Sequence, residues 1–194
     1  MIGYDHEPIY AVGSLLGGMD VKGMFQLLDE AEVQGVDVMS LGVTLAWATE
    51  ALQRGLISTT ETDGLELAWG NYPAYIAATE RIVSQPNDFF RALARGVDFA
   101  ANIYGGVDFA LAFGGNEMPG YHTGPGCHLG YLTGARHSHL DSAGYSLDQK
   151  AAVKGEGLTP QGVAKALVEE ERWRQVLTSL VICLFARGMY TAEV

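Results

Sequence analysis

Apolar residues recur with the 3.6-residue period of an α-helix along most of this sequence, and residues that begin or end helices separate the periodic segments. Asp20, for example, can cap a helix that Gly35 is placed to end. The expected helices span 20–35, 40–54, 71–84, 87–96 and 159–188. Only residues 65–69 alternate in the manner of a short strand or extended segment. The sequence therefore predicts an all-α, multihelical bundle with minimal strand content.

One long stretch, residues 105–144, breaks this pattern. It shows no helical period, it holds four of the five histidines, and glycines punctuate it at positions 114, 115, 120, 124, 126, 130 and 134. Long irregular segments in compact domains are usually functional. We therefore expect a long Gly/His-rich functional loop here.

The charge of the chain excludes several classes of partner. A formal net charge of -11 repels both phosphate backbones and anionic lipid, so we expect neither nucleic-acid nor membrane-surface binding. The sequence contains no run of about 20 apolar residues and no leader-like segment near Met1, which favours a cytoplasmic protein.

The histidine-rich loop suggests zinc as one possible ligand. Four histidines and a cysteine fall within 18 positions, namely His122, Cys127, His128, His137 and His139. Their spacing matches no standard zinc module. The alternative is that these histidines make hydrogen bonds to backbone groups that the loop cannot otherwise satisfy.

Two carboxylates are further candidates. Glu7 precedes an apolar run and is either a partly buried carboxyl suited to proton transfer or a solvated N-terminal carboxylate. Glu117 lies among glycines, where its carboxylate could contact a ligand or accept backbone N–H bonds as a loop cap. Taken alone, these residues give no complete catalytic set.

Four motifs in the first half of the chain resemble one known family in their order. Residues 3–7 (GYDHE) are similar to its G-P-E-x-E run, and residues 32–42 (EVQGVDVMSLG) to its D-x-x-G-L-D and I-S-x-G pattern, with Glu in place of the first Asp. Residues 50–55 resemble its E-x-x-x-x-G-L motif, and residues 69–71 its F-G-N. This is the aldehyde:ferredoxin oxidoreductase family of tungsten enzymes.

The second half continues the resemblance with larger departures. Residues 115–121 are similar to K-G-x-E-x-P-x-Y, without the lysine, and residues 129–133 to L-x-Y-A-T. Residues 134–137 resemble the G-A-x-H motif that places a histidine near tungsten, although His139 is a competing alignment. Residues 178–183 occupy the place of a second motif, D-x-x-G-L-C, with Thr for Asp and Val for Gly.

The resemblance implies tungsten, or molybdenum, held by two pterin dithiolenes beside a [4Fe–4S] cluster. The metal centre would oxidise an aldehyde to a carboxylic acid, and the cluster would pass electrons to ferredoxin. Glu7 and His137 would then be the catalytic residues that manage protons beside the metal. Gly35 and Asp37 would contact one pterin, and Cys183 would ligate the cluster. Glu32 and Glu117 are further cofactor-binding residues that the resemblance implies.

The same resemblance indicates what the sequence lacks. A [4Fe–4S] cluster usually takes four thiolates, and this chain has two cysteines and no C-x-x-C-x-x-x-C run. We therefore expect a fragment that is inactive and cofactor-free in isolation, completed by an N-terminal pterin-binding domain. Residues 1–105 would be part of the second family domain and residues 106–194 part of a truncated third, the two packed as one unit. Apolar surface left uncovered would favour homo-oligomers.

One alternative follows from the altered second motif. A family member that has lost pterin contacts could serve as a noncatalytic helical interaction module. The choice of metal and the identity of the aldehyde stay open.

Overall fold

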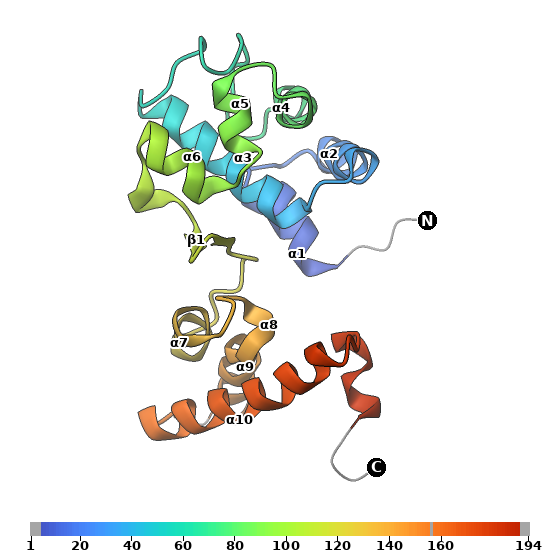
Figure 1. The fold of residues 1–194 in the computed structure, drawn as a ribbon, viewed down its shortest axis with the longest axis vertical. Coiled ribbons are helices and arrows are strands. Elements are labelled where there is room, and N and C mark those ends of the chain that lie inside the picture. The colour runs from blue at the N-terminus through green and yellow to red at the C-terminus, as the bar shows by residue number, and fades with distance from the viewer. Residues whose placement is uncertain (1–4, 156, 191–194) are drawn as a thin grey trace. The chain divides into compact units, whose positions relative to one another are not determined.

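The computed structural model describes residues 5–155 and 157–190, and it confirms the mainly helical fold (Figure 1). Strands within the described residues are limited to β1 (Ala112–Phe113) and β2 (Asn116–Glu117), which pair antiparallel as a small hairpin. The chain divides into two compact units, Met1–Gly120 and Tyr121–Val194. Compactness does not locate the limits of a family domain, so the division at residue 105 stays a prediction.

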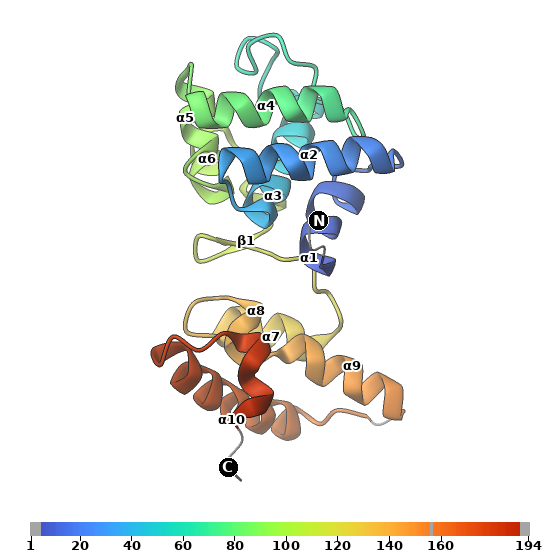
Figure 2. The same ribbon diagram turned by 90° about the vertical axis from the view of Figure 1, so that its right-hand side faces the viewer.

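The first unit is a cluster of helices around α3. Its elements are α1 (His6–Ile9), η1 (Tyr10–Ser14), α2 (Val21–Gln34), α3 (Val38–Gln53), α4 (Tyr72–Ser84), α5 (Asp88–Leu93), α6 (Val97–Tyr104), η2 (Val107–Phe109) and the β1–β2 hairpin. Helices α2 and α4 run side by side (Figure 2), and α3 contacts η1, α2, α4 and α6. Helix α3 is therefore the central element of this unit.

Helix α3 is buried because it is apolar on nearly every side, as its sequence predicts. Trp47 is 2% exposed and stacks near Phe89, with ring centroids 6.5 Å apart. Gly42 lets α3 approach η1 closely, since a Cβ at this position would lie 2.4 Å from the carbonyl oxygen of Ala11. The helix begins at Val38, two residues before the expected Ser40.

The predicted helix starts rest on side-chain caps that the structure confirms. The Asp20 carboxylate accepts from the backbone N–H of Lys22 at 3.0 Å, and Asn87 accepts from that of Phe90 at 3.0 Å. Asn71 caps α4 in the same way. Residues 65–69 form no paired strand, and Trp69 lies in a turn.

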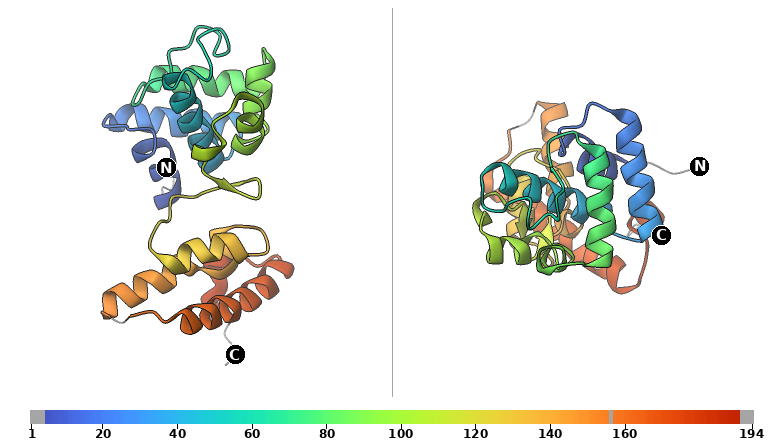
Figure 3. Two further views of the ribbon diagram at one scale, coloured as in Figure 1. Left: turned by 90° about the vertical axis from the view of Figure 1, so that its left-hand side faces the viewer. Right: turned by 90° about the horizontal axis from the view of Figure 1, so that it is seen from above.

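The second unit contains α7 (Pro125–Thr133), α8 (His139–Ser142), α9 (Gly144–Lys154), α10 (Pro160–Ser179) and η3 (Leu184–Met189). Helix α10 lies along α7, α8 and α9 (Figure 3). It ends at Ser179 rather than near Gly188, because Val181 adopts a left-handed conformation with φ 58°. No helix in the described part of the chain is both long and apolar enough to cross a membrane.

The expectation of an irregular stretch over residues 105–144 was wrong in its extent, because α7 and α8 lie within it. Its glycines serve close helix packing. A Cβ at Gly130 would lie 2.6 Å from Ser142 Oγ, and one at Gly144 would lie 1.9 Å from the carbonyl oxygen of Gly126. Helix α7 can therefore pack directly against α8 and the start of α9.

This packing predicts a large effect of one methyl group. We expect Gly144→Ala to lower the free energy of unfolding by more than about 2 kcal/mol, because the new Cβ overlaps α7 backbone. Gly188→Ala is the matched control, since a Cβ at Gly188 meets nothing within 4 Å. Urea denaturation followed by circular dichroism measures both variants, and equal stabilities would contradict the packing argument.

Candidate functional site

The run of residues 32–37 forms a helix-ending turn. Gly35 is left-handed with φ 69°; its N–H donates to the carbonyl of Glu32 at 3.2 Å, and the N–H of Val36 donates to that of Ala31 at 3.1 Å. This hydrogen-bond pattern satisfies the last carbonyls of α2 and suits glycine. The side chain of Glu32 is exposed, so the contribution of Glu32 to the turn is its backbone carbonyl.

Asp37 follows this turn directly and begins the next helix. Its carboxylate accepts from the backbone N–H of Ser40 at 2.8 Å and so caps α3. The carboxylate remains solvent-exposed while it caps the helix. The turn at Gly35 thus places Asp37 at the positive end of the buried helix.

The run of residues 178–183 folds in the same way at the end of α10. The N–H of Val181 donates to the carbonyl of Thr178 at 2.9 Å, and the N–H of Ile182 donates to that of Leu177 at 3.0 Å. Cys183 then occupies the N-cap position of η3, as Asp37 does for α3. The second motif therefore keeps its backbone geometry although valine replaces glycine.

Glu117 fastens the β1–β2 hairpin to two helix starts. Its Oε2 accepts from Ser40 Oγ at 3.1 Å, and its Oε1 accepts from the backbone N–H of Val97 at 3.0 Å. A Cβ at Gly96 would lie 2.7 Å from the same Oε1, so glycine permits this approach. Asp37 and Glu117 are brought together because both bind Ser40. The bond from the Val97 N–H to Glu117 is of the kind expected for a loop cap.

A pocket of about 240 Å³ lies beside this cluster. Its polar groups come from Asp37, Ser40 and Thr44, and its apolar walls come from α3, α4 and α5. Ligand pockets that enclose a whole small molecule usually measure about 300–1,000 Å³. This pocket can therefore receive the edge of a ring system, with the remainder lying outside it.

Glu7 lies on α1 in the first unit. Asp5 caps this short helix by accepting from the N–H of Glu7 at 2.9 Å, and Glu7 itself is half-buried. Gly3 and Tyr4, which complete the matching run, lie outside the described residues. His137 belongs to the second unit, so a shared site with Glu7 stays a prediction.

His137 follows α7 in a tight, hydrogen-bonded loop. Its φ is 56°, its N–H donates to the carbonyl of Gly134 at 3.1 Å, and its Nδ1 lies 2.8 Å from the carbonyl oxygen of Tyr131. The competing residue His139 begins α8, where its ring lies 5.3 Å from that of Tyr121. Of the two, His137 has the more constrained backbone.

Two buried carboxylates of the second unit were not anticipated. Asp148 accepts from the backbone N–H groups of Gly126 at 2.9 Å and Cys127 at 2.7 Å and so caps α7. Asp141 is 0% exposed and pairs with the Arg136 guanidinium, Nε to Oδ1, at 2.8 Å. The sequence holds one signal for Asp141: Ser138 and Asp141 have the S-x-x-D spacing of a capping box, which the structure contains.

The environment of Asp141 sets its ionisation. Burial alone would raise the pKa of this carboxyl. Hydrogen bonds from the backbone N–H and guanidinium of Arg136 and from the N–H of Ser138, together with the Arg136 charge, outweigh burial and hold the pKa below its ordinary value.

The histidine-rich loop does not assemble a zinc site. Among the described residues, no three His, Cys, Asp or Glu side chains converge as metal ligands would. Cys127 is buried, and its Sγ lies 2.9 Å from the carbonyl oxygen of Tyr121. His122 and His128 face each other with ring centroids 5.6 Å apart, and burial, with a smaller contribution from His128, lowers the pKa of His122. The zinc interpretation therefore has no supporting geometry.

Cys183 is an exposed, free thiol beside a pocket of about 360 Å³. The pocket is lined by apolar residues of the C-terminal segment and by Arg136, which precedes His137 in the chain. Because the sulfur is exposed, it is accessible as a single ligand to a group bound outside this segment.

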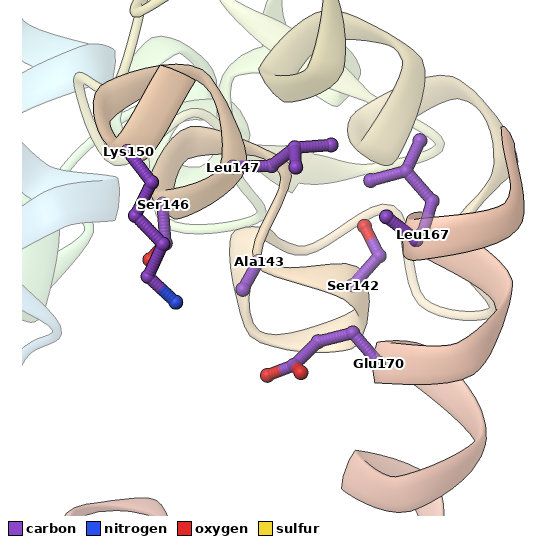
Figure 4. A pocket seen from close by; sticks show the side chains of 8 residues that line it. Ser142, Ala143, Ser146, Leu147, Lys150, Leu167 and Glu170 are labelled. Carbon is purple, nitrogen blue, oxygen red and sulfur yellow. The ribbon is translucent and has the colours of Figure 1, made fainter. Parts of the chain in front are cut away.

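A smaller pocket of about 170 Å³ lies between α9 and α10 and contains none of the predicted site residues (Figure 4). Lys150 and Glu170 border it on different sides, and Ser142 Oγ points toward Leu167 rather than toward either charge. The Ser142 hydroxyl is buried without a hydrogen-bond partner among the described residues, close to Gly130 of α7. This hydroxyl belongs to the α7–α8 packing contact.

Comparison with known proteins gives a consistent result. The family described as "Aldehyde ferredoxin oxidoreductase, domains 2 & 3" matches residues 1–194. The tungsten-containing aldehyde ferredoxin oxidoreductase of Thermococcus kodakarensis is 31% identical over 137 residues, which cover 69% of this chain and 22% of that protein. The protein of the same name from Pyrococcus furiosus is 27% identical over 191 residues, covering 94% and 31%. The chain thus spans less than a third of these curated relatives.

Substitution of the left-handed residue in each helix-ending turn should change the free energy of unfolding, with opposite signs in the two turns. Val181 is 92% exposed, so Val181→Gly removes backbone strain without loss of packing and should raise the free energy of unfolding by about 1 kcal/mol. Gly35→Ala, where a Cβ meets nothing within 4 Å, should lower it by about as much. Chemical denaturation measures both, and a destabilised Val181→Gly would contradict the assigned turn.

Asp141 predicts a pH dependence of stability. Because its folded pKa is lowered, ionised Asp141 stabilises the chain above its ordinary pKa of 3.8, and this contribution is lost as pH falls through that value toward the folded pKa. Asp141→Asn should cost about 3 kcal/mol at neutral pH and flatten the acid limb. Urea denaturation from about pH 7 to about pH 3 measures both effects, and parallel acid limbs would exclude this role.

Proposed function

The chain belongs to the aldehyde ferredoxin oxidoreductase family, matching its domains 2 and 3, and we propose that it forms the helical portion of a tungsten or molybdenum pterin enzyme that oxidises aldehydes to carboxylic acids. When bound, the metal–pterin centre would supply the oxidation, and a [4Fe–4S] cluster would pass the electrons to ferredoxin. Because the chain spans 31% or less of its curated relatives, the remaining parts of the site are proposed to lie on the rest of a longer protein.

The shared geometry of the two helix-ending turns is the main support for this proposal. Both segments that resemble the family's paired motifs end a helix through a left-handed residue and then present one functional side chain, Asp37 or Cys183. The loss of glycine at Val181 left this backbone arrangement in place.

The pocket beside Asp37 fits a partial pterin site. Carboxylate and hydroxyl groups at its rim can bind the donor-rich edge of a pterin ring, and apolar α3 residues can contact its face. Gly35 and Asp37 would hold one pterin, with the exposed carboxylate of Glu32 nearby. Glu117 would act by keeping Ser40 and the start of α3 in position.

The cysteines fit a cluster that is shared with another part of the protein. Cys183 is exposed and could supply one thiolate, while buried Cys127 already contacts a backbone carbonyl. Since a [4Fe–4S] cluster usually takes four thiolates, the other ligands would come from outside this chain. This part alone would be inactive, and ferredoxin would bind the complete enzyme.

Substitution of the two cysteines tests the cluster assignment in the longer protein. Cys183→Ser should lower iron content well below about four per polypeptide and abolish aldehyde-dependent ferredoxin reduction, while tungsten is retained. Cys127→Ser, which can still donate to the Tyr121 carbonyl, should leave iron unchanged. Full iron in Cys183→Ser would remove the ligand assignment.

The proposed proton carriers are Glu7 and His137. Glu7→Gln keeps the size of the half-buried side chain but removes its titration, so turnover should fall while metal content stays constant. Unchanged turnover would return Glu7 to a structural role.

The noncatalytic module stays the second candidate, because Thr178 supplies no carboxylate where the family motif has Asp. It predicts a longer protein that contains neither tungsten nor molybdenum. A cytoplasmic location and homo-oligomer formation remain predictions of the sequence.

A further inference from the structure

We infer that Asp141 is a positioning residue for His137, and that its carboxylate clamps the loop so that the imidazole presents Nε2 as its proton acceptor. The inference rests on the proposed proton role of His137 and deepens it. It concerns a buried residue outside the motifs that pointed to the family.

The clamp is formed by a single carboxylate oxygen. Asp141 Oδ2 accepts from the backbone N–H of Arg136 at 2.8 Å and from that of Ser138 at 3.2 Å. These residues flank His137 on both sides, so the backbone at His137 is held at two adjacent points.

The second oxygen prevents the carboxylate from turning. Asp141 Oδ1 accepts from Arg136 Nε at 2.8 Å and from Gln175 Nε2, on α10, at 3.2 Å. Asp141 is fully buried, and α8 packs on α10. The clamp is thus connected to the longest helix of the unit.

The clamp holds His137 in a conformation that it would not choose alone. A left-handed φ of 56° costs a residue with a Cβ about 1 kcal/mol and persists where surrounding bonds determine it. Breaking those bonds should release the residue to an ordinary conformation. The ring direction would then change with the backbone.

The ring tautomer follows from the partner of Nδ1. A backbone carbonyl can only accept, so the 2.8 Å contact with the Tyr131 oxygen requires a proton on Nδ1. Tyr131 lies in the last turn of α7, where carbonyls lack partners within the helix. Neutral His137 therefore carries its lone pair on Nε2, for which the described residues provide no hydrogen-bond partner.

The test is ¹⁵N NMR of the 194-residue chain at about pH 8, where an unperturbed imidazole is neutral. Signals of His137 are assigned by their loss in His137→Gln. Wild type should show a protonated-type shift at Nδ1 and a lone-pair-type shift at Nε2. Asp141→Asn should move the ring toward the Nε2–H tautomer that predominates in free histidine.

Asp148→Asn is the matched control, because it removes the other buried carboxylate of the unit without touching residues 136–138. It should destabilise the chain and leave the His137 tautomer unchanged. If Asp141→Asn does not fold by circular dichroism, Gln175→Ala should shift the tautomer in the same direction to a smaller extent.

An Nε2–H tautomer in wild type would overturn the inference, as would an unchanged tautomer in folded Asp141→Asn. A different result would count against the proposed proton role of His137 alone. If the tautomer follows Asp141 but His137→Ala in the longer enzyme keeps full turnover, the clamp stands and the proton role of His137 is removed.

Discussion

In each unit, the position of one predicted site residue depends on how a helix ends. At Gly35 and at Val181, a left-handed residue lets two backbone N–H groups return to the last carbonyls of the helix and turns the chain into the next element. The residue two positions later, Asp37 or Cys183, is thereby placed at a helix start. Local backbone geometry thus determines which side chain lies at each helix start. The left-handed conformation costs little free energy at Gly35 and more at Val181, because valine has a Cβ.

Carboxylates hold other local elements together within each unit. Glu117 joins the hairpin to α3 and α6 in the first unit, and Asp141 and Asp148 hold α7 and its following loop in the second. Each accepts backbone N–H groups that would otherwise lack partners near a helix start or in a tight loop. In a chain of net charge -11, these acidic groups are structural and not merely solubilising.

Features governed by neighbours in the sequence could be predicted, and features governed by distant neighbours could not. The caps at Asp20, Asn71 and Asn87 and the stop at Gly35 are local signals, and the structure confirms them. The sequence did not predict helix α7. Gly130 is needed there because a larger residue would meet Ser142, and sequence spacing does not reveal that contact. The candidate site residues follow the same rule: the sequence indicates Asp37 and Glu117, but not that both bind Ser40.

We propose that this chain presents site residues but supplies only one wall of the cofactor site. Elemental mass spectrometry tests it most directly, on chain purified without oxygen from cells supplied with tungstate, molybdate, iron and zinc. We expect a folded, helical protein with each of these metals far below one atom per chain. Tungsten or molybdenum near one per chain would contradict it, because residues 1–194 would then hold the metal–pterin centre without any other part of the enzyme.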